Sequence, residues 1–246
     1  MKVSEWFYSI QGEGVTAGKP ALFIRLAGCN FMCGGFGGEL LRQGKATWYC
    51  DTEPVWKQGR EVSAAGLITE INKAYPQVLG GIKNQRINII ITGGEPTLPH
   101  NIEAVQELRE WFTIAGISPF YEVETNASML VDYDCLFDQI NASPKLANSG
   151  MPRALRQNRQ AIDLIQQHRN AWFKFVVNTE EDVCEIEREW VTGMGVREDR
   201  LILMPGCDNI ADLQKASVFA AQAAIDRGWR FSSRIQVAVW DKTTGV

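Results

Sequence analysis

The amino-acid sequence predicts an α/β fold, an open and partial (β/α)6 TIM-like barrel, in one domain that spans residues 1–246. Short, almost continuously apolar runs alternate with amphipathic segments of helical period, as in parallel sheets covered by helices. About six such pairs occur, which is fewer than the eight of a closed barrel. The 246 residues, 45% of them hydrophobic, suffice for one complete core and contain no obvious boundary or low-complexity segment.

The first half of the chain contributes the first three predicted strands. Residues 3–9 alternate loosely and predict an edge strand, and residues 20–27 predict the first buried strand. The segment 61–75 has apolar residues at helical spacing and predicts a helix. Residues 86–92 include four isoleucines and predict a buried parallel strand, which ends in a glycine-rich turn before a helix over 99–115.

The same alternation continues in the second half of the chain. Strands are predicted over 120–125, 136–142, 171–178, 201–204 and 234–240, and helices over 153–168, 180–194 and 211–228. Ligands of such folds gather at the carboxyl ends of the strands, so the segments that follow strands are the candidates for a functional site.

Composition and charge argue against two classes of partner. The net charge is −4 and the pI about 5.4, with Lys and Arg scattered, so no nucleic-acid partner is expected. The amino terminus lacks the apolar core of a signal peptide, and no run is long enough to span a membrane. Six cysteines without a secretion signal indicate a cytoplasmic protein whose thiols stay reduced.

Three cysteines, Cys29, Cys33 and Cys50, follow the first buried strand. A structural zinc site needs four nitrogen or sulfur ligands, whereas this region offers three thiols and no nearby histidine. A 4Fe–4S cluster on three thiolates makes better chemical sense, because one iron stays free to bind a substrate or cofactor. On spacing alone, three cysteines without a metal, two of them small buried hydrophobes, explain the pattern equally well.

Six short motifs, in one order along the chain, resemble the radical S-adenosylmethionine (SAM) family: Ser9–Gly14, Phe23–Asn30, Cys50–Thr52, Ile91–Pro96, Glu124–Asn126 and Ser143–Lys145. Within that family they closely resemble the 7-carboxy-7-deazaguanine synthases of the QueE type, from the amino terminus to about residue 145. The resemblance implies a radical SAM barrel with a 4Fe–4S cluster on Cys29, Cys33 and Cys50. Most members space these cysteines C-x3-C-x2-C, whereas the last gap here is sixteen residues, so residues 34–49 form an insertion.

The resemblance also implies three sets of ligand-binding residues. SAM is expected at Gly93, Gly94, Glu95, Glu124, Asn126, Ser143, Pro144 and Lys145. A pterin substrate is expected at Gln11, Gly12, Glu13, Arg25, Thr92 and the terminal Val246. Mg²⁺, which prefers oxygen ligands, is expected at Thr52 together with the substrate carboxylate. Arg25 is the one charge of a buried strand, so we expect its guanidinium to pair with that carboxylate.

The implied reaction is the ring contraction of 6-carboxy-5,6,7,8-tetrahydropterin to 7-carboxy-7-deazaguanine with release of ammonia. This carbon–nitrogen lyase step belongs to the biosynthesis of queuosine and other 7-deazapurines. A flavodoxin-like or other low-potential reductant and a homodimer are implied as well. Two alternatives stay open: a radical SAM activase of a partner enzyme, which would lack Gln11–Glu13 and Arg25, and a non-enzymatic metal-binding protein. Gln236 stands where the family often has a histidine, an exchange that keeps hydrogen bonding but loses charge.

Overall fold

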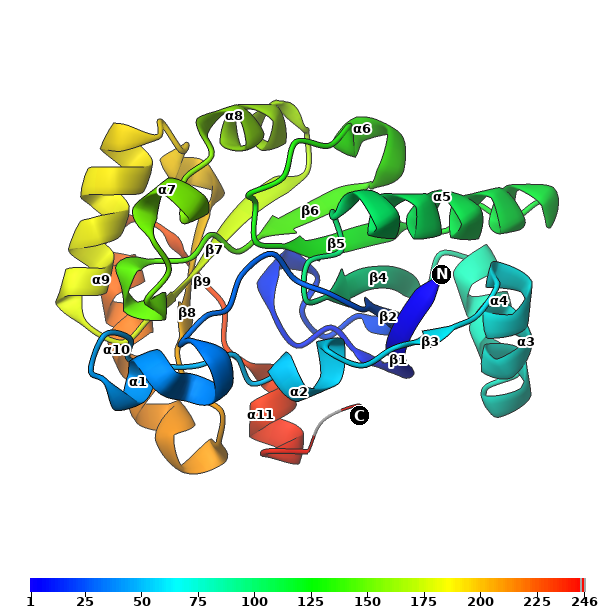
Figure 1. The fold of residues 1–246 in the computed structure, drawn as a ribbon, viewed down its shortest axis with the longest axis horizontal. Helices are drawn as coiled ribbons and strands as arrows, with labels where there is room; N and C mark the ends of the chain where they lie inside the picture. Colours follow the sequence, from blue (N-terminus) through cyan, green and yellow to red (C-terminus); the bar gives the residue numbers. More distant parts are fainter. Residues whose placement is uncertain (244, 246) are drawn as a thin grey trace.

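The computed structural model describes residues 1–243 and 245, and its centre is a nine-stranded sheet of order β3-β1-β2-β4-β5-β6-β7-β8-β9 (Figure 1). The strands are β1 (Lys2–Ile10), β2 (Pro20–Leu26), β3 (Arg60–Glu61), β4 (Asn88–Gly93), β5 (Tyr121–Thr125), β6 (Gln139–Ala142), β7 (Ala171–Val177), β8 (Leu201–Pro205) and β9 (Arg230–Phe231). All neighbours from β2 to β9 are parallel, whereas β1 is antiparallel to β2 and β3. The sheet is not closed, so the predicted partial barrel is confirmed.

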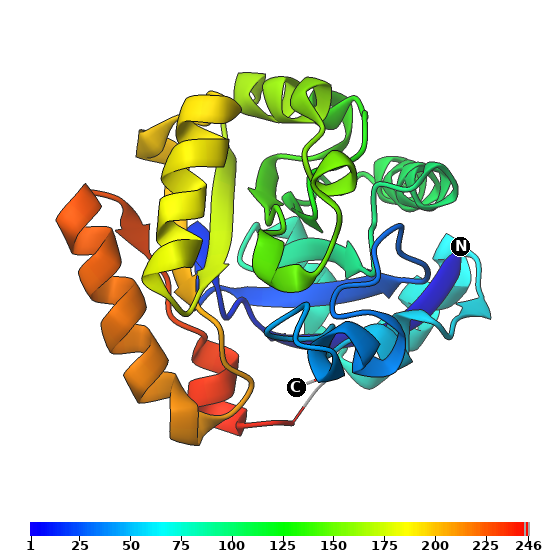
Figure 2. The same cartoon turned by 60° about the vertical axis from the view of Figure 1, so that its left-hand side comes forward.

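The α-helices are α1 (Glu39–Arg42), α2 (Glu53–Trp56), α3 (Ala64–Ala74), α4 (Gln77–Lys83), α5 (Pro99–Ile114), α6 (Tyr133–Leu136), α7 (Arg153–Arg156), α8 (Arg159–Gln167), α9 (Glu180–Glu185), α10 (Ile210–Arg227) and α11 (Ile235–Trp240). The longer helices α3, α5, α8 and α10 lie on the outer side of the sheet, whereas α1 and α2 lie near the strand ends (Figure 2). Five further short helical segments are Gly14–Thr16, Phe36–Gly38, Ala147–Ser149, the π-helix Ile186–Gly193 and Glu198–Arg200. Within the described residues, no helix has the length and apolarity needed to cross a bilayer.

The hydrophobic core lies between the outer face of the sheet and these helices. Alternate residues of β2 and β4, such as Ile24, Ile89 and Ile91, belong to one buried cluster with Leu67 of α3 and Leu108 of α5. The other face of each strand points into the barrel. Because this inner face carries charged and polar side chains, the outer core supplies the hydrophobic stabilisation and leaves the interior free for a site.

Helix boundaries follow local capping chemistry. Ser63 accepts a hydrogen bond from the Gly66 N–H and starts α3, so the predicted helix 61–75 begins later than expected, after β3. The predicted helix 153–168 is divided into α7 and α8, because Asn158 caps a new helix at Ala161 N–H. The predicted helix 180–194 starts with a capping box between Thr179 and Asp182 and continues as a π-helix. Helix α4 was not predicted.

The prediction of a last strand over 234–240 is wrong, because this segment is the helix α11. The edge of the sheet beside β8 is occupied by β9, which was not predicted. Alternating β-branched residues favoured a strand, yet only Val237 of this helix is buried, and the Ile235 N–H bonds to the Gly12 carbonyl. Tertiary contact with the turn after β1 therefore overrides the local pattern.

Candidate functional site

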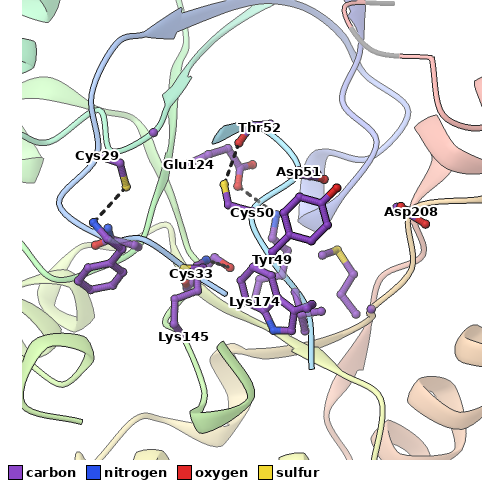
Figure 3. A pocket seen from close by; sticks show the side chains of 18 of the residues that line it. Cys29, Cys33, Tyr49, Cys50, Asp51, Thr52, Glu124, Lys145, Lys174 and Asp208 are labelled. Carbon is purple, nitrogen blue, oxygen red and sulfur yellow. Dashed lines mark hydrogen bonds and ion pairs between the residues drawn. The ribbon is translucent and has the colours of Figure 1, made fainter. Parts of the chain in front are cut away.

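A cavity of about 520 Å³ lies at the carboxyl ends of the parallel strands (Figure 3). Its lining includes the residues that end or follow β2, β4, β5, β6, β7 and β8, namely Arg25, Thr92–Gly94, Glu124–Asn126, Ser143, Lys145, Val176, Asn178, Met204 and Gly206. The segment before α2 closes another side through Thr47–Thr52. The cavity therefore stands where a parallel α/β sheet places its ligands.

The three predicted cluster cysteines all line this cavity (Figure 3). Burial raises the pKa of Cys29 to about 12 and that of Cys33 to about 11, because it disfavours the charged thiolate. The Cys50 N–H donates to the Cys33 carbonyl at 3.1 Å, which ties the two distant ligands together. No three His, Cys, Asp or Glu residues of the described chain converge on a single ion. Three thiols that line one cavity but do not converge on a single ion suit a multi-iron cluster better than a lone zinc ion.

The Gly93–Gly94 turn brings the end of β4 against the start of the cysteine segment. A Cβ at Gly93 would overlap the Leu26 carbonyl, and one at Gly94 would overlap the Gly28 carbonyl and lie 2.6 Å from Cys29 Cβ. The Glu95 N–H also donates to Gly28 O at 2.9 Å. Glycine is thus required here by close approach of two backbones, and the turn exposes its polar backbone groups to the cavity.

The Glu95 carboxylate does not line the cavity. It is fully buried beneath the turn and accepts hydrogen bonds from the Thr97 N–H and hydroxyl, the Thr125 hydroxyl at 2.8 Å and the Asn126 N–H at 2.7 Å. Burial raises the pKa of Glu95. Its four donors brace the turn against β5, so Gly93 and Gly94 line the cavity while the Glu95 carboxylate does not.

Four other residues predicted at SAM follow β5 and β6. Lys145 Nζ donates to the Ser143 carbonyl at 2.8 Å and lies 3.2 Å from its hydroxyl, and both residues line the cavity. Pro144 between them is buried and is not part of the lining. Asn126 lines the cavity and donates to Asn30 Oδ1 at 2.9 Å, which links β5 to the cysteine segment.

Glu13 and Glu124, expected at two different ligands, lie in one buried polar network. Glu13 Oε2 is 2.6 Å and Glu124 Oε2 is 3.0 Å from Nζ of Lys174 in β7. Glu13 Oε1 accepts from Arg234 Nε at 3.1 Å and from Gln236 Nε2 at 2.6 Å. These donors outweigh burial and lower the pKa of Glu13 to about 2.

Gln11 and Gly12, the remaining residues of the predicted Gln11–Gly12–Glu13 motif, contact residues of this network on the side away from the cavity. Gln11 donates to Glu124 Oε1 at 3.0 Å, and Gly12 packs against Gln236. Neither lines the cavity. Sequence analysis did not select Lys174 or Arg234. Lys174 carried the same signal as Arg25, because it is the one charge in an otherwise apolar strand.

Arg25 lines the cavity, but a carboxylate of the chain already pairs with it. Its Nε donates to Glu5 Oε1 at 2.7 Å, and Nη1 donates to the Gly93 carbonyl at 3.2 Å. Glu5 on β1 thus supplies the counter-charge that we expected only from a ligand. Thr92, also predicted at the substrate, lines the cavity beside it, and Val246 lies outside the described residues.

The insertion 34–49 forms one wall of the cavity through Leu41, Trp48 and Tyr49. It is fixed to the segment after β6: Gly34 N–H donates to Ser149 O, and Trp48 Nε1 donates to Asn148 Oδ1 at 2.9 Å. Thr52 follows this insertion in the chain and also lines the cavity. Its hydroxyl lies 3.4 Å from Cys50 Sγ. The predicted Mg²⁺ ligand and the third cysteine therefore share one edge of the site.

Comparison with known proteins gives a consistent set of relatives. The chain is 30% identical over 247 residues to the 7-carboxy-7-deazaguanine synthase of Pyrobaculum aerophilum, covering 100% of this chain and 97% of the relative. It is 27% identical to the enzyme of the same name from Halobacterium salinarum, covering 98% and 91%. The crystal structure of QueE from Escherichia coli superposes with a TM-score of 0.63 and 22% identity, covering 95% and 93% of the two chains. No family model matches the chain.

Proposed function

This chain belongs to the 7-carboxy-7-deazaguanine synthase family, and from that premise we propose that the cavity at the carboxyl ends of its strands is the active site. The protein is a radical SAM enzyme of 7-deazaguanine biosynthesis. It contracts the ring of 6-carboxy-5,6,7,8-tetrahydropterin to 7-carboxy-7-deazaguanine with loss of ammonia. The observation that carries the site assignment is that the thiols of Cys29, Cys33 and Cys50, one buried and two half-buried, line one cavity together with the Gly93–Gly94 turn.

In this proposal Cys29, Cys33 and Cys50 hold the 4Fe–4S cluster. When bound, the cluster and SAM would supply the radical chemistry that starts the reaction at C6 of the substrate. The Gly93–Gly94 backbone accepts the amino group of SAM, in place of the buried Glu95 carboxylate. Asn126, Ser143 and Lys145 offer polar groups to the rest of SAM, with Pro144 holding the last two in place.

The substrate lies between Arg25 and the network around Glu13. Arg25 offers its remaining guanidinium N–H groups to the C6 carboxylate, beside Thr92, while Glu5 and the Gly93 carbonyl keep the guanidinium in orientation. Glu124 is assigned to the substrate rather than to SAM, because it shares Lys174 with Glu13 and accepts from Gln11. Burial from water keeps competing hydrogen donors away from the radical.

A Mg²⁺ ion at Thr52 is part of the proposal. Mg²⁺ retains several waters and takes few protein oxygens, so one hydroxyl and the substrate carboxylate form a sufficient set. Product formation by chelator-treated enzyme should rise on addition of Mg²⁺, and Thr52→Val should weaken that response while keeping the cluster. A rate that ignores Mg²⁺ in the wild type would contradict this assignment.

The test of the site is cluster assembly in single cysteine variants. Anaerobically purified Cys29→Ala, Cys33→Ala and Cys50→Ala should each lose cluster iron, the brown colour and product formation. Cys135→Ala is the matched control, because this thiol is exposed on α6 and does not line the cavity. A full cluster in Cys33→Ala would show that the second ligand lies elsewhere than in the segment 29–50.

Three further features complete the proposal. A low-potential donor such as a flavodoxin-like protein supplies the electron for cleavage of SAM, because the radical chemistry needs one from outside. The protein works as a homodimer of single-domain chains, which light scattering of the purified protein tests. Six free thiols and an iron–sulfur cluster favour the reducing cytoplasm as its compartment.

A further inference from the structure

Lys174 is a buried ammonium at the floor of the cavity, and its burial needs an explanation. Its side chain is 5% exposed, lies on the inner face of β7 and lines the cavity between Glu13 and Glu124 (Figure 3). Taking a charge out of water costs several kcal/mol, and a well-packed apolar residue often stabilises a fold as well as a buried ion pair. A cation kept at this position therefore suggests a role beyond packing.

The hydrogen-bond count shows what this group of residues has left for a ligand. Lys174 has three N–H donors, and two of them go to Glu13 and Glu124; the third has no partner in the described part of the chain. Each carboxylate offers about four acceptor sites and receives three donors. For Glu124 these are Lys174, Gln11 and Asn141. Glu13, Lys174 and Glu124 thus form an acceptor–donor–acceptor row.

The carboxylates around the row outnumber the cations by one even with Lys174, and by two without it. Three carboxylates, Glu13, Glu122 and Glu124, face two cations, Lys174 and Arg234. The carboxylate of Glu122 accepts hydrogen bonds, among the described residues, only from neutral side chains, those of Thr16, Asn88, Gln139 and Asn141. Among the described residues, Lys174 is the one cation that contacts two of these three carboxylates, so it holds Glu13 and Glu124 next to each other.

We propose that Lys174 is a substrate-contacting specificity residue, which holds Glu13 and Glu124 in a row and donates its third N–H to a ring acceptor of the substrate. The proposal rests on the proposed function. An acceptor–donor–acceptor row matches a ring edge with the opposite pattern. A 2-amino-4-oxo tetrahydropteridine has such an edge in its 2-amino group, N1 and N8–H. The other candidate edge includes N5, which borders the reacting C6, whereas the N1 edge points away from that carbon.

The test compares two ligands on three proteins. The ligands are 6-carboxy-5,6,7,8-tetrahydropterin and its 2-oxo (lumazine) analogue, in which the 2-amino donor becomes an acceptor and N1 becomes N–H. The proteins are cluster-loaded wild type, Lys174→Met and Phe175→Leu. Phe175 is the matched control, because it is buried in the same strand but packs on Trp190 away from the cavity.

We expect Lys174→Met to weaken binding of the pterin by about 10- to 100-fold, the effect of losing a charge-assisted donor and the alignment of two acceptors. The affinity for the lumazine analogue should fall much less in Lys174→Met. Phe175→Leu should bind both ligands as tightly as the wild type does. SAM binding and iron content should stay at the wild-type level. Equal losses for both ligands, or no loss for the pterin, would overturn the proposal. Wild type that neither binds nor converts the pterin would instead refute the proposed function.

A pH profile supplies a readout that a structural role would not move. Burial raises the pKa of Glu124, and Glu13 and Glu122 raise it further, while Lys174 opposes them. Lys174→Met should therefore shift the acid limb of kcat/KM to higher pH, and Lys174→Arg should leave it near that of the wild type. Lys174→Arg keeps the charge, so it is informative even if the methionine variant fails to fold. Its planar guanidinium places its N–H donors differently from the lysine ammonium, so this variant should still discriminate less between the two ligands than the wild type. An Arg variant that discriminates like the wild type would count against a direct Lys174 contact.

Discussion

At the scale of single residues, two strands of the barrel each carry one charge on the inner face. Arg25 in β2 pairs with Glu5, and Lys174 in β7 pairs with Glu13 and Glu124. An isolated charge in an apolar strand is costly, so each such residue indicates where the interior turns polar. The partners of these charges lie far away in the sequence, at separations of 20, 161 and 50 residues.

Arg25 gives the first prediction. Arg25→Ala should lower kcat/KM for product formation by about 10- to 100-fold, since charge-assisted hydrogen bonds to a carboxylate are lost. Arg25→Lys keeps the charge but loses the two-pronged guanidinium, so its kcat/KM should lie between those of the wild type and Arg25→Ala. Cleavage of SAM without pterin should persist, because the guanidinium is assigned to the substrate carboxylate. Anaerobic assays of 5′-deoxyadenosine and of product check this, and a parallel loss of both would assign Arg25 to the fold or the cluster.

Glu13 gives a prediction for stability against pH. Its folded-state pKa, about 2, lies below the ordinary value of 4.5, so its ionised form favours the folded state. This contribution is complete above pH 4.5 and is lost as the pH falls towards 2, with an upper size of roughly 3 kcal/mol. Glu13→Gln should flatten the decline of the free energy of unfolding in this window, measured by urea titration. Glu110 is an exposed glutamate on α5, so the free energy of unfolding of Glu110→Gln should decline over this pH range as it does in the wild type.

At the scale of elements, the insertion 34–49 acts as a wall with fixed ends rather than as a loose loop. Its backbone bonds to the segment 148–149 place Cys50 beside Cys33 despite the sixteen residues between them. The wide cysteine spacing is therefore compatible with a single cluster site, because tertiary hydrogen bonds replace the short spacing that is usual in the family.

Two glycines of the insertion provide a matched pair of variants. Both have positive φ, +77° at Gly34 and +55° at Gly37, so alanine costs similar backbone strain at each. A Cβ at Gly34 would overlap Tyr49 and the Trp48 carbonyl, whereas one at Gly37 meets nothing within 4 Å. Gly34→Ala should therefore lower the free energy of unfolding by about 1–3 kcal/mol more than Gly37→Ala and reduce iron per chain. Equal iron content in the two variants would separate the insertion from cluster assembly.

At the scale of the whole molecule, side chains and a turn join the two ends of the open sheet. The turn after β1 and the segment before α11 meet through Gly14 N–H to the Ser232 hydroxyl at 2.8 Å and Ile235 N–H to the Gly12 carbonyl at 3.0 Å. Glu13 adds its bonds to Arg234 and Gln236. These contacts couple the carboxyl-terminal helix to the floor of the cavity, where a closed barrel would have a strand ladder.

Gly12 allows this coupling to be measured. A Cβ at Gly12 would overlap the Gln236 side-chain oxygen, so Gly12→Ala should cost about 1–3 kcal/mol of unfolding free energy and weaken pterin binding. Gln236→Ala in the same chain removes the overlap and should recover part of the loss. A double-mutant cycle on thermal and urea unfolding yields the coupling energy, and strictly additive effects would rule out the contact.

Local patterns in the sequence determined most of the strands and helices up to β8, the open barrel, the membership of the family and the strand ends where the cavity lies. Those patterns record period, burial and short motifs, which neighbouring residues share. The tertiary structure alone decided that residues 235–240 form a helix, that the Glu95 carboxylate is used up under its turn, that Glu5 pairs with Arg25, and that Lys174 joins Glu13 to Glu124. The physical reason is that each of these outcomes depends on which distant groups come within hydrogen-bond distance. Such distances are set by the packing of the whole sheet and not by the residues next in the chain.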